Sequence, residues 1–133
     1  MNPVTMAALR ARERKFLLAH ELCRLATSSK QGRPHVVPVI YTVDGEDIII
    51  AVDYKTKKLR NLRENPKVAL VVDEYRPNRG LMVEGNCEIL ERGREYLRLL
   101  QILFDRFVFY RRNPWSEGES PILKIRPTRA VMW

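Results

Sequence analysis

The segment AVDYKTKKLRNLRENPKVALVV, residues 51–72, places positive charge between two apolar runs. Four cations fall within six residues: Lys55, Lys57, Lys58 and Arg60. A short helix is expected to begin near Thr56, and the first turn of a helix presents unpaired N–H groups and a partial positive charge. Together with a hydroxyl and ammonium groups, such a turn can bind a phosphate. The alternative is a solvated basic helix whose cations pair with Glu64.

Composition limits the classes of partner. The chain has 133 residues, which suits a single domain over residues 1–133, and its formal net charge of +8 favours an anionic partner. No apolar run approaches the roughly 20 residues of a membrane span, and the N-terminus lacks the apolar core of a signal peptide. We therefore expect a cytoplasmic protein that does not enter a membrane. Cys23 and Cys87 have no metal-ligand spacing, so we expect core thiols and no metal site.

The elements around the cationic segment are mostly strands. The periodicity predicts an N-terminal helix over residues 5–20, capped by Thr5, and further helices over 56–64 and 93–112. Strands are expected at residues 23–29, 36–43, 48–52, 68–73 and 81–91, with strand-like ends at 122–125 and 130–133. A tight Asp44-Gly45 turn joins two of these strands, whereas a parallel sheet would need a helix after nearly every strand. The sequence therefore predicts a mainly β fold with α, as a six-stranded antiparallel barrel of Greek-key type with flanking helices.

Five segments, in their order and spacing, carry a family resemblance. They are GRPHVVPV (32–39), VDG (43–45), TKKLRNLRENPKVALVV (56–72), MVEGNCEIL (82–90) and IRPTRAVMW (125–133). The chain from about residue 22 to 133 resembles the flavin-binding split-barrel family, which includes pyridoxamine 5'-phosphate oxidase and the deazaflavin-dependent oxidoreductases. The resemblance implies a split β-barrel that forms a homodimer, with each cofactor in a groove between subunits.

The resemblance also implies which residues bind the cofactor. They are Val36, Val37, Pro38, Val39, Ala51, Val52, Thr56, Lys57, Lys58, Asn61, Arg79 and Gly80. Residues 56–58 would hold the flavin phosphate, residues 36–40 would line the ring largely through backbone groups, and Arg79 with Gly80 would reach it from the partner chain. The oxidase has an aromatic and a hydroxyl residue where this chain has Ala51 and Val52. It also has an Arg and a Lys where this chain has Val36 and Tyr41, which argues against oxidation of pyridoxamine phosphate.

Other candidate residues keep two interpretations. Trp115 could cover a ligand or fix its loop, and Trp133 could contact the cofactor or plug the barrel. His35 is either a polar group near the cofactor or an edge histidine. The apolar stripe over residues 99–110 indicates core or a dimer contact. No Ser-His-Asp, Cys-His or paired-carboxylate pattern stands out, so no catalytic residue is assigned, as expected where a flavin carries the redox chemistry.

The leading hypothesis is an FMN-binding oxidoreductase that acts on a small-molecule substrate. The first alternative is a deazaflavin coenzyme in the same groove, since its longer acidic tail would suit an open basic surface. The second is a flavin-binding protein without turnover. The third is a nucleic-acid-binding barrel, which would need aromatics interleaved with cations on an exposed sheet face. Only Tyr41 and Tyr54 lie near the basic segment, which argues against nucleic acid.

Overall fold

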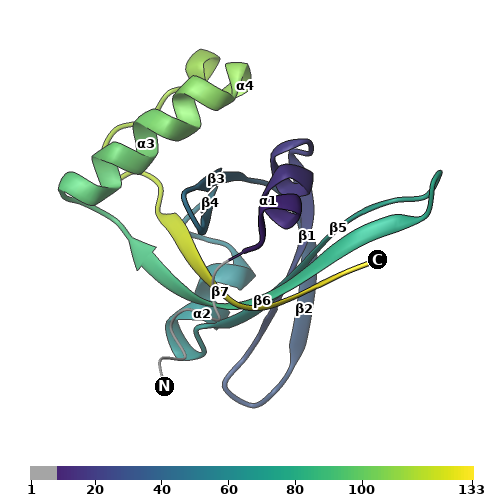
Figure 1. The fold of residues 1–133 in the computed structure, drawn as a ribbon. Helices are drawn as coiled ribbons and strands as arrows, with labels where there is room; N and C mark the ends of the chain where they lie inside the picture. The colour runs from purple at the N-terminus through teal and green to yellow at the C-terminus, as the bar shows by residue number, and fades with distance from the viewer. Residues whose placement is uncertain (1–8) are drawn as a thin grey trace, which may run out of the picture.

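A single curled antiparallel sheet forms the body of the molecule (Figure 1). The computed structural model describes residues 9–133. The strands are β1 (Leu22–Ser28), β2 (Pro34–Ile40), β3 (Thr42–Asp44), β4 (Asp47–Ala51), β5 (Lys67–Glu74), β6 (Arg79–Leu90) and β7 (Ile122–Met132). The helices are α1 (Ala11–Leu18), α2 (Lys57–Glu64), α3 (Arg94–Arg106) and α4 (Val108–Arg112). Within the described residues, no helix is long and apolar enough to span a bilayer.

The sheet order is β2-β1-β5-β6-β7-β4-β3, which confirms the mainly β, antiparallel prediction. Seven strands form, rather than six, because the apolar run 36–43 is divided at Tyr41. The backbone N–H of Tyr41 donates to the carbonyl of Glu21 at 2.9 Å, and its ring is fully buried. The two edge strands, β2 and β3, therefore follow one another in the chain. This arrangement curls the sheet.

Three element boundaries differ from those predicted. The helix expected over residues 93–112 is broken at Phe107, whose backbone is extended and whose ring is buried. The two C-terminal strand ends form one strand, β7, because a register shift at Gly85 accommodates Pro127, which has no N–H to donate. Within the described residues, the N-terminal helix covers residues 11–18, since the Glu13 carboxylate accepts a hydrogen bond from the Arg10 N–H and fixes its start. The predicted cap Thr5 lies outside the described residues.

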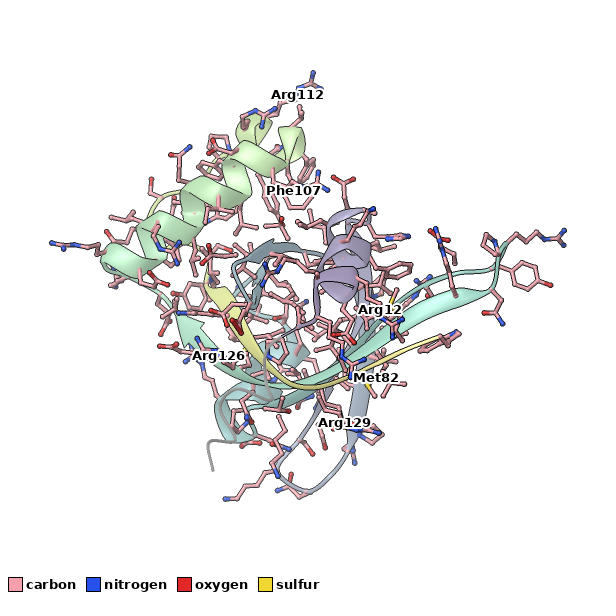
Figure 2. All side chains as sticks on the ribbon, viewed as in Figure 1. Arg12, Met82, Phe107, Arg112, Arg126 and Arg129 are labelled. Atoms are coloured by element: carbon pink, nitrogen blue, oxygen red, sulfur yellow. The ribbon has the colours of Figure 1, made fainter. Side chains whose placement is uncertain are left out.

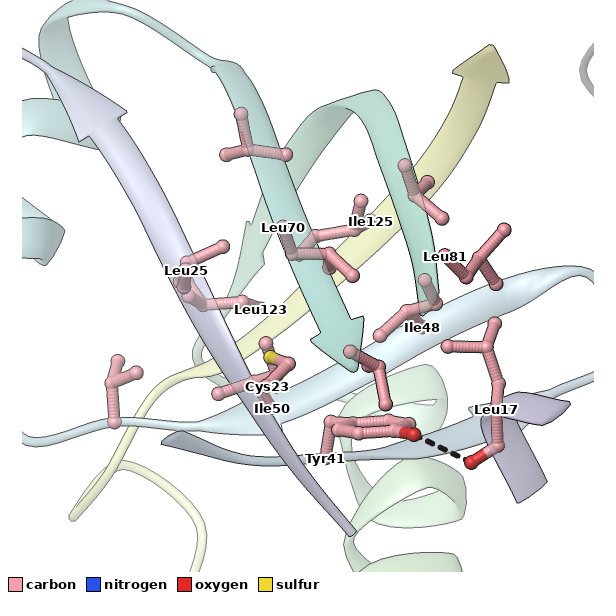
Figure 3. Packing of buried hydrophobic residues seen from close by; sticks show 14 of the residues in the cluster. Leu17, Cys23, Leu25, Tyr41, Ile48, Ile50, Leu70, Leu81, Leu123 and Ile125 are labelled. Carbon is pink, nitrogen blue, oxygen red and sulfur yellow. Dashed lines mark hydrogen bonds between the residues drawn. The ribbon is translucent and has the colours of Figure 1, made fainter. Parts of the chain in front are cut away.

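The apolar side chains form two cores, one on each side of β4. Successive residues of a strand point to opposite faces, so Ile48 and Ile50 enter the barrel core while Ile49 packs against α3. Figure 3 shows the barrel core, which includes Leu25, Leu70 and Leu123. Burial raises the pKa of both free thiols, Cys23 and Cys87, to about 12, so both stay protonated near neutral pH.

The Tyr41 hydroxyl ties the barrel core to α1. It donates to the Leu17 carbonyl at 2.5 Å, inside the core drawn in Figure 3. We expect Tyr41→Phe to lower the free energy of unfolding by about 1–3 kcal/mol, because a buried carbonyl loses its partner. Urea unfolding of the variant measures this, with Tyr75→Phe as the control because Tyr75 is exposed. Equal stability of the two variants would contradict the assigned contact.

Candidate functional site

A cleft lies where the ends of β2 and β4 meet α2, α4 and the loop after α4. We call it the α2–α4 cleft. Its lining residues are Val39, Ile40, Ala51, Val52, Asp53, Lys58, Phe109, Tyr110, Asn113, Trp115, Glu119 and Ser120. Its volume is about 440 Å³, within the range of about 300–1,000 Å³ typical of small-molecule sites. One part of the lining is apolar and aromatic, and the other part carries charged groups.

The structure brings part of the predicted site together in this cleft. Of the twelve residues implied by the family resemblance, four line it: Val39, Ala51, Val52 and Lys58. Thr56 and Lys57 are half-buried immediately before Lys58 at the start of α2. Val36, Val37 and Pro38 lie upstream of Val39 on β2 and do not line the cleft. Asn61, Arg79 and Gly80 also lie outside its lining.

The start of α2 has the features of an anion-binding turn. Thr56 occupies the N-cap position, but its hydroxyl donates to the Asp53 carbonyl at 2.9 Å and does not cap the helix. Within the described part of the chain, the N–H groups of the first turn therefore have no side-chain acceptor. Neither Lys57 nor Lys58 forms an ion pair within residues 9–133, and the pairing with Glu64 considered from the sequence is not observed there.

Burial shifts the pKa values of two side chains that line the cleft, Lys58 and Tyr110. The pKa of Lys58 lies below its ordinary value because partial burial disfavours the ammonium, although the Asp53 carboxylate acts in the opposite direction. The pKa of Tyr110 is raised to about 12, mainly by burial and further by Asp53. Tyr110 is therefore a protonated hydrogen-bond donor at neutral pH, and Lys58 is a partly desolvated cation that a ligand anion would stabilise.

Asn61 holds α2 against the sheet. It is only 2% exposed, and its Nδ2 donates to the hydroxyl of Thr27 on β1 at 3.0 Å. Leu59 and Leu62, on the same helix, are buried in the barrel core. Asn61 thus fixes the position of the helix that carries Lys58, and its side chain is turned away from the cleft lining.

An aromatic wall closes the other side of the cleft, and of its residues only Trp115 was a candidate from the sequence. Trp115 packs edge-on against Tyr110 and Phe104, with ring centroids 4.9 and 5.0 Å apart. Phe109 lies beside Tyr110 on α4, with ring centroids 6.0 Å apart. Five aromatic residues between positions 104 and 115 were the available signal. Their periodicity also fits core packing, so the signal alone could not separate the two interpretations.

A relay of hydrogen bonds fixes this wall to the barrel. The Trp115 indole N–H donates to the Tyr96 hydroxyl at 2.9 Å, and that hydroxyl donates to the Ser120 carbonyl at 2.6 Å. The Ser120 hydroxyl donates to the carbonyl of Val52, at the end of β4. Trp115 therefore lines the cleft and is fixed in its loop, as the second interpretation expected, while its covering of a ligand stays a prediction.

The residues predicted to reach a partner's cofactor lie far along the β5–β6 hairpin, which projects from the barrel (Figure 1). Arg79 forms an ion pair with Glu74 at 2.7 Å, and Glu74 also accepts from His20 at 2.7 Å. The backbone of Gly80 exchanges two hydrogen bonds with Trp133, and a Cβ at Gly80 would lie 2.5 Å from the Trp133 ring. Trp133 therefore packs on the hairpin and not in the α2–α4 cleft.

Comparison with known proteins gives consistent matches. The model of the family described as pyridoxamine 5'-phosphate oxidase matches residues 9–133. A 5a,11a-dehydrotetracycline/5a,11a-dehydrooxytetracycline reductase of Streptomyces rimosus is 30% identical over 92% of this chain and 80% of its own length.

Solved structures share the fold. An FAD-binding protein of Mesorhizobium loti has 25% identity and a TM-score of 0.72, covering 93% of this chain and 92% of its own. An F420 reductase has 24% identity and a TM-score of 0.71, covering 92% of this chain and 98% of its own. These likenesses confirm the split-barrel fold.

The hydrogen bonds that Tyr96 forms with Trp115 and Ser120 can be tested by mutation. We expect Tyr96→Phe to lower the free energy of unfolding by about 1–3 kcal/mol, because the Trp115 N–H and the Ser120 carbonyl both lose a partner. In a Trp133→Phe background, Trp115 fluorescence should shift to longer wavelength as water reaches the indole. Tyr75→Phe in the same background is the control. An unshifted spectrum and unchanged stability in Tyr96→Phe would refute the relay.

Proposed function

Because the chain belongs to the pyridoxamine 5'-phosphate oxidase family, we propose that it is an FMN-binding oxidoreductase whose cofactor occupies the α2–α4 cleft. The observation that carries this proposal is the pairing of an uncapped helix start, with unpaired lysines, and an apolar, aromatic cleft. The first feature suits a phosphate and the second suits a flat ring. Both features fit FMN.

The phosphate would bind at the start of α2. The first-turn N–H groups and the ammonium groups of Lys57 and Lys58 are the donors. The Thr56 hydroxyl would join them only by giving up its hydrogen bond to the Asp53 carbonyl, because a hydroxyl has a single proton to donate. A dianionic group there would offset the desolvation of Lys58, whose pKa burial lowers. Asn61 acts indirectly, because its hydrogen bond to Thr27 keeps α2 in place.

The ring would lie between the sheet edge and the aromatic wall. Among the strands that the structure describes, β2 pairs with β1 alone, so its outer edge offers backbone N–H and C=O groups to a ligand near Val39. Trp115 and Tyr110 would exclude water from the opposite side, and the Tyr110 hydroxyl would remain a donor. Bound FMN would supply exchange of a hydride with a small-molecule substrate. The chain's own part is to bind, orient and desolvate.

A homodimer would complete the site. The projecting β5–β6 hairpin carries Arg79 and Gly80 well away from this chain's own cleft. A second copy could receive this hairpin, as the family resemblance implies. The Arg79–Glu74–His20 cluster then gives the hairpin a defined shape before it meets a partner.

A deazaflavin coenzyme is the second candidate. Two more cations, Lys55 and Arg60, are exposed beside the start of α2 and exceed what one phosphate requires. They would suit a longer acidic tail that extends out of the cleft, and the net charge of +8 agrees with this. At 24% identity, the F420 reductase is evidence for a shared fold only. The main support for a deazaflavin coenzyme is therefore the pair of additional cations, Lys55 and Arg60.

The double variant Lys57→Gln/Lys58→Gln tests the phosphate site. We expect its Kd for FMN to rise at least about tenfold, because the variant loses the charge-assisted hydrogen bonds from two ammonium groups to the phosphate. Such bonds are stronger than hydrogen bonds between neutral groups. Absorbance and quenching of flavin fluorescence measure this binding.

The matched control is Lys15→Gln/Lys30→Gln, which removes the same charge away from the cleft. Equal affinity of the two double variants would show that phosphate binds elsewhere. Uptake of a deazaflavin coenzyme by the wild-type chain, without uptake of FMN, would assign the second candidate. Folded protein that binds neither would reject both.

A further inference from the structure

We propose that a second cavity beside the cleft binds a flat, largely apolar small molecule that carries one carbonyl or acidic group. We call this cavity the α4 groove. It has a volume of about 590 Å³ and is lined by Glu21, Ile40, Arg106, Phe107, Val108 and Phe109. Its role as the substrate subsite rests on the proposed function, but the groove can be tested independently of it.

The groove and the α2–α4 cleft share two wall residues. Ile40, at the end of β2, and Phe109, on α4, line both cavities. Molecules bound in the two cavities would therefore be neighbours across these side chains. Reacting atoms must approach to about 3–3.5 Å, so a ring in the groove would have to extend past Ile40 or Phe109 to react with a ring in the cleft. The position of the groove thus favours a role coupled to the cleft.

The break between α3 and α4 creates the groove. Phe107 is extended, and its ring is buried among the α3 core residues. Figure 2 labels Phe107 on the side of α4 that faces the barrel. The chain then starts α4 with Val108 and Phe109 turned outward, exposed to 50% and 65%. Apolar side chains exposed together at a cavity commonly mark a binding surface. An unbroken helix over residues 93–112 would not have presented them in this way.

The lining defines the chemistry of the ligand. Ile40, Phe107, Val108 and Phe109 supply apolar walls suited to a flat ring system. At one end, Arg106 pairs with Glu21 at 2.6 Å, and its guanidinium lies 5.3 Å from the centroid of the Phe107 ring. A guanidinium has five N–H donors, so those not used by Glu21 can bind a ligand oxygen. The groove therefore suits a ring compound with a carbonyl, carboxylate or sulfonate.

Anilinonaphthalene sulfonate is a suitable probe, because it combines apolar rings with one anionic group. We would titrate it by fluorescence into the FMN-loaded protein, and measure FMN affinity and oligomeric size for every variant. Val108→Asp should raise the Kd of the probe about tenfold or more while FMN affinity stays unchanged, because a carboxylate would meet the apolar rings. Phe109→Ala should weaken both ligands, since Phe109 lines both cavities.

Leu97→Asp is the matched control, because Leu97 is 48% exposed on α3 and lines neither cavity. Circular dichroism checks that each variant folds. The proposal is overturned if Val108→Asp and Leu97→Asp bind the probe equally, or if FMN displaces the probe. It is also overturned if Val108→Asp dissociates an oligomer, since the groove would then be a contact between chains. Probe binding that depends on Val108 in a chain that cannot bind FMN would keep the groove but reject its substrate role.

Discussion

Positive charge at the start of α2, held partly out of water and in no ion pair within residues 9–133, is the constraint on which the proposed site depends. Lys58 reaches into a cleft where burial lowers its pKa, and the hydroxyl of Thr56 does not cap the helix. A folded chain keeps such an arrangement at a cost in solvation. The buried Asn61–Thr27 hydrogen bond keeps the helix from relaxing away. The arrangement is stabilised if an anion is the normal occupant.

The cleft lies at the boundary between two apolar cores. Val39 packs against the barrel core, whereas Ile40 and Ala51 pack against the core beneath α3. Since β4 is buried on both faces, it separates the two cores and ends at the cleft. Beyond the end of β4, the side chains of the two cores leave the α2–α4 cleft between them. The Trp115–Tyr96–Ser120 relay holds the aromatic wall on one side of this cleft. The pocket is thus a consequence of the layering.

Local patterns in the sequence were sufficient for much of this architecture. The Asp44-Gly45 turn and the β-branched runs predicted the antiparallel strands, and the cations beside Thr56 predicted the start of α2. What could not be predicted depends on contacts between distant residues. β7 runs through Pro127 because its pairing with β6 shifts by one residue at Thr128, between the pairs Glu84–Arg129 and Gly85–Pro127. The helix breaks at Phe107 because its ring is buried against the sheet and α3.

The candidate site, too, could be predicted only where its residues are neighbours in the sequence. The residues at the start of α2 are neighbours in sequence, so their type and spacing were enough to indicate an anion. The aromatic wall comes from a segment some fifty residues later and depends on the break at Phe107, so the periodicity alone indicated core or a dimer contact. The resemblance implied that Asn61 binds the cofactor, and the structure adds a buried hydrogen bond to Thr27 that helical spacing cannot predict.

The most direct test of the account compares FMN with riboflavin, which has the same ring but no phosphate. Both would be titrated into the wild-type chain under identical buffer and salt. If the phosphate binds at the start of α2, FMN should bind about a hundredfold more tightly than riboflavin, and high salt should reduce the difference. Equal affinity for the two compounds would contradict the account, because the positive charge on α2 would then have no part in binding the cofactor.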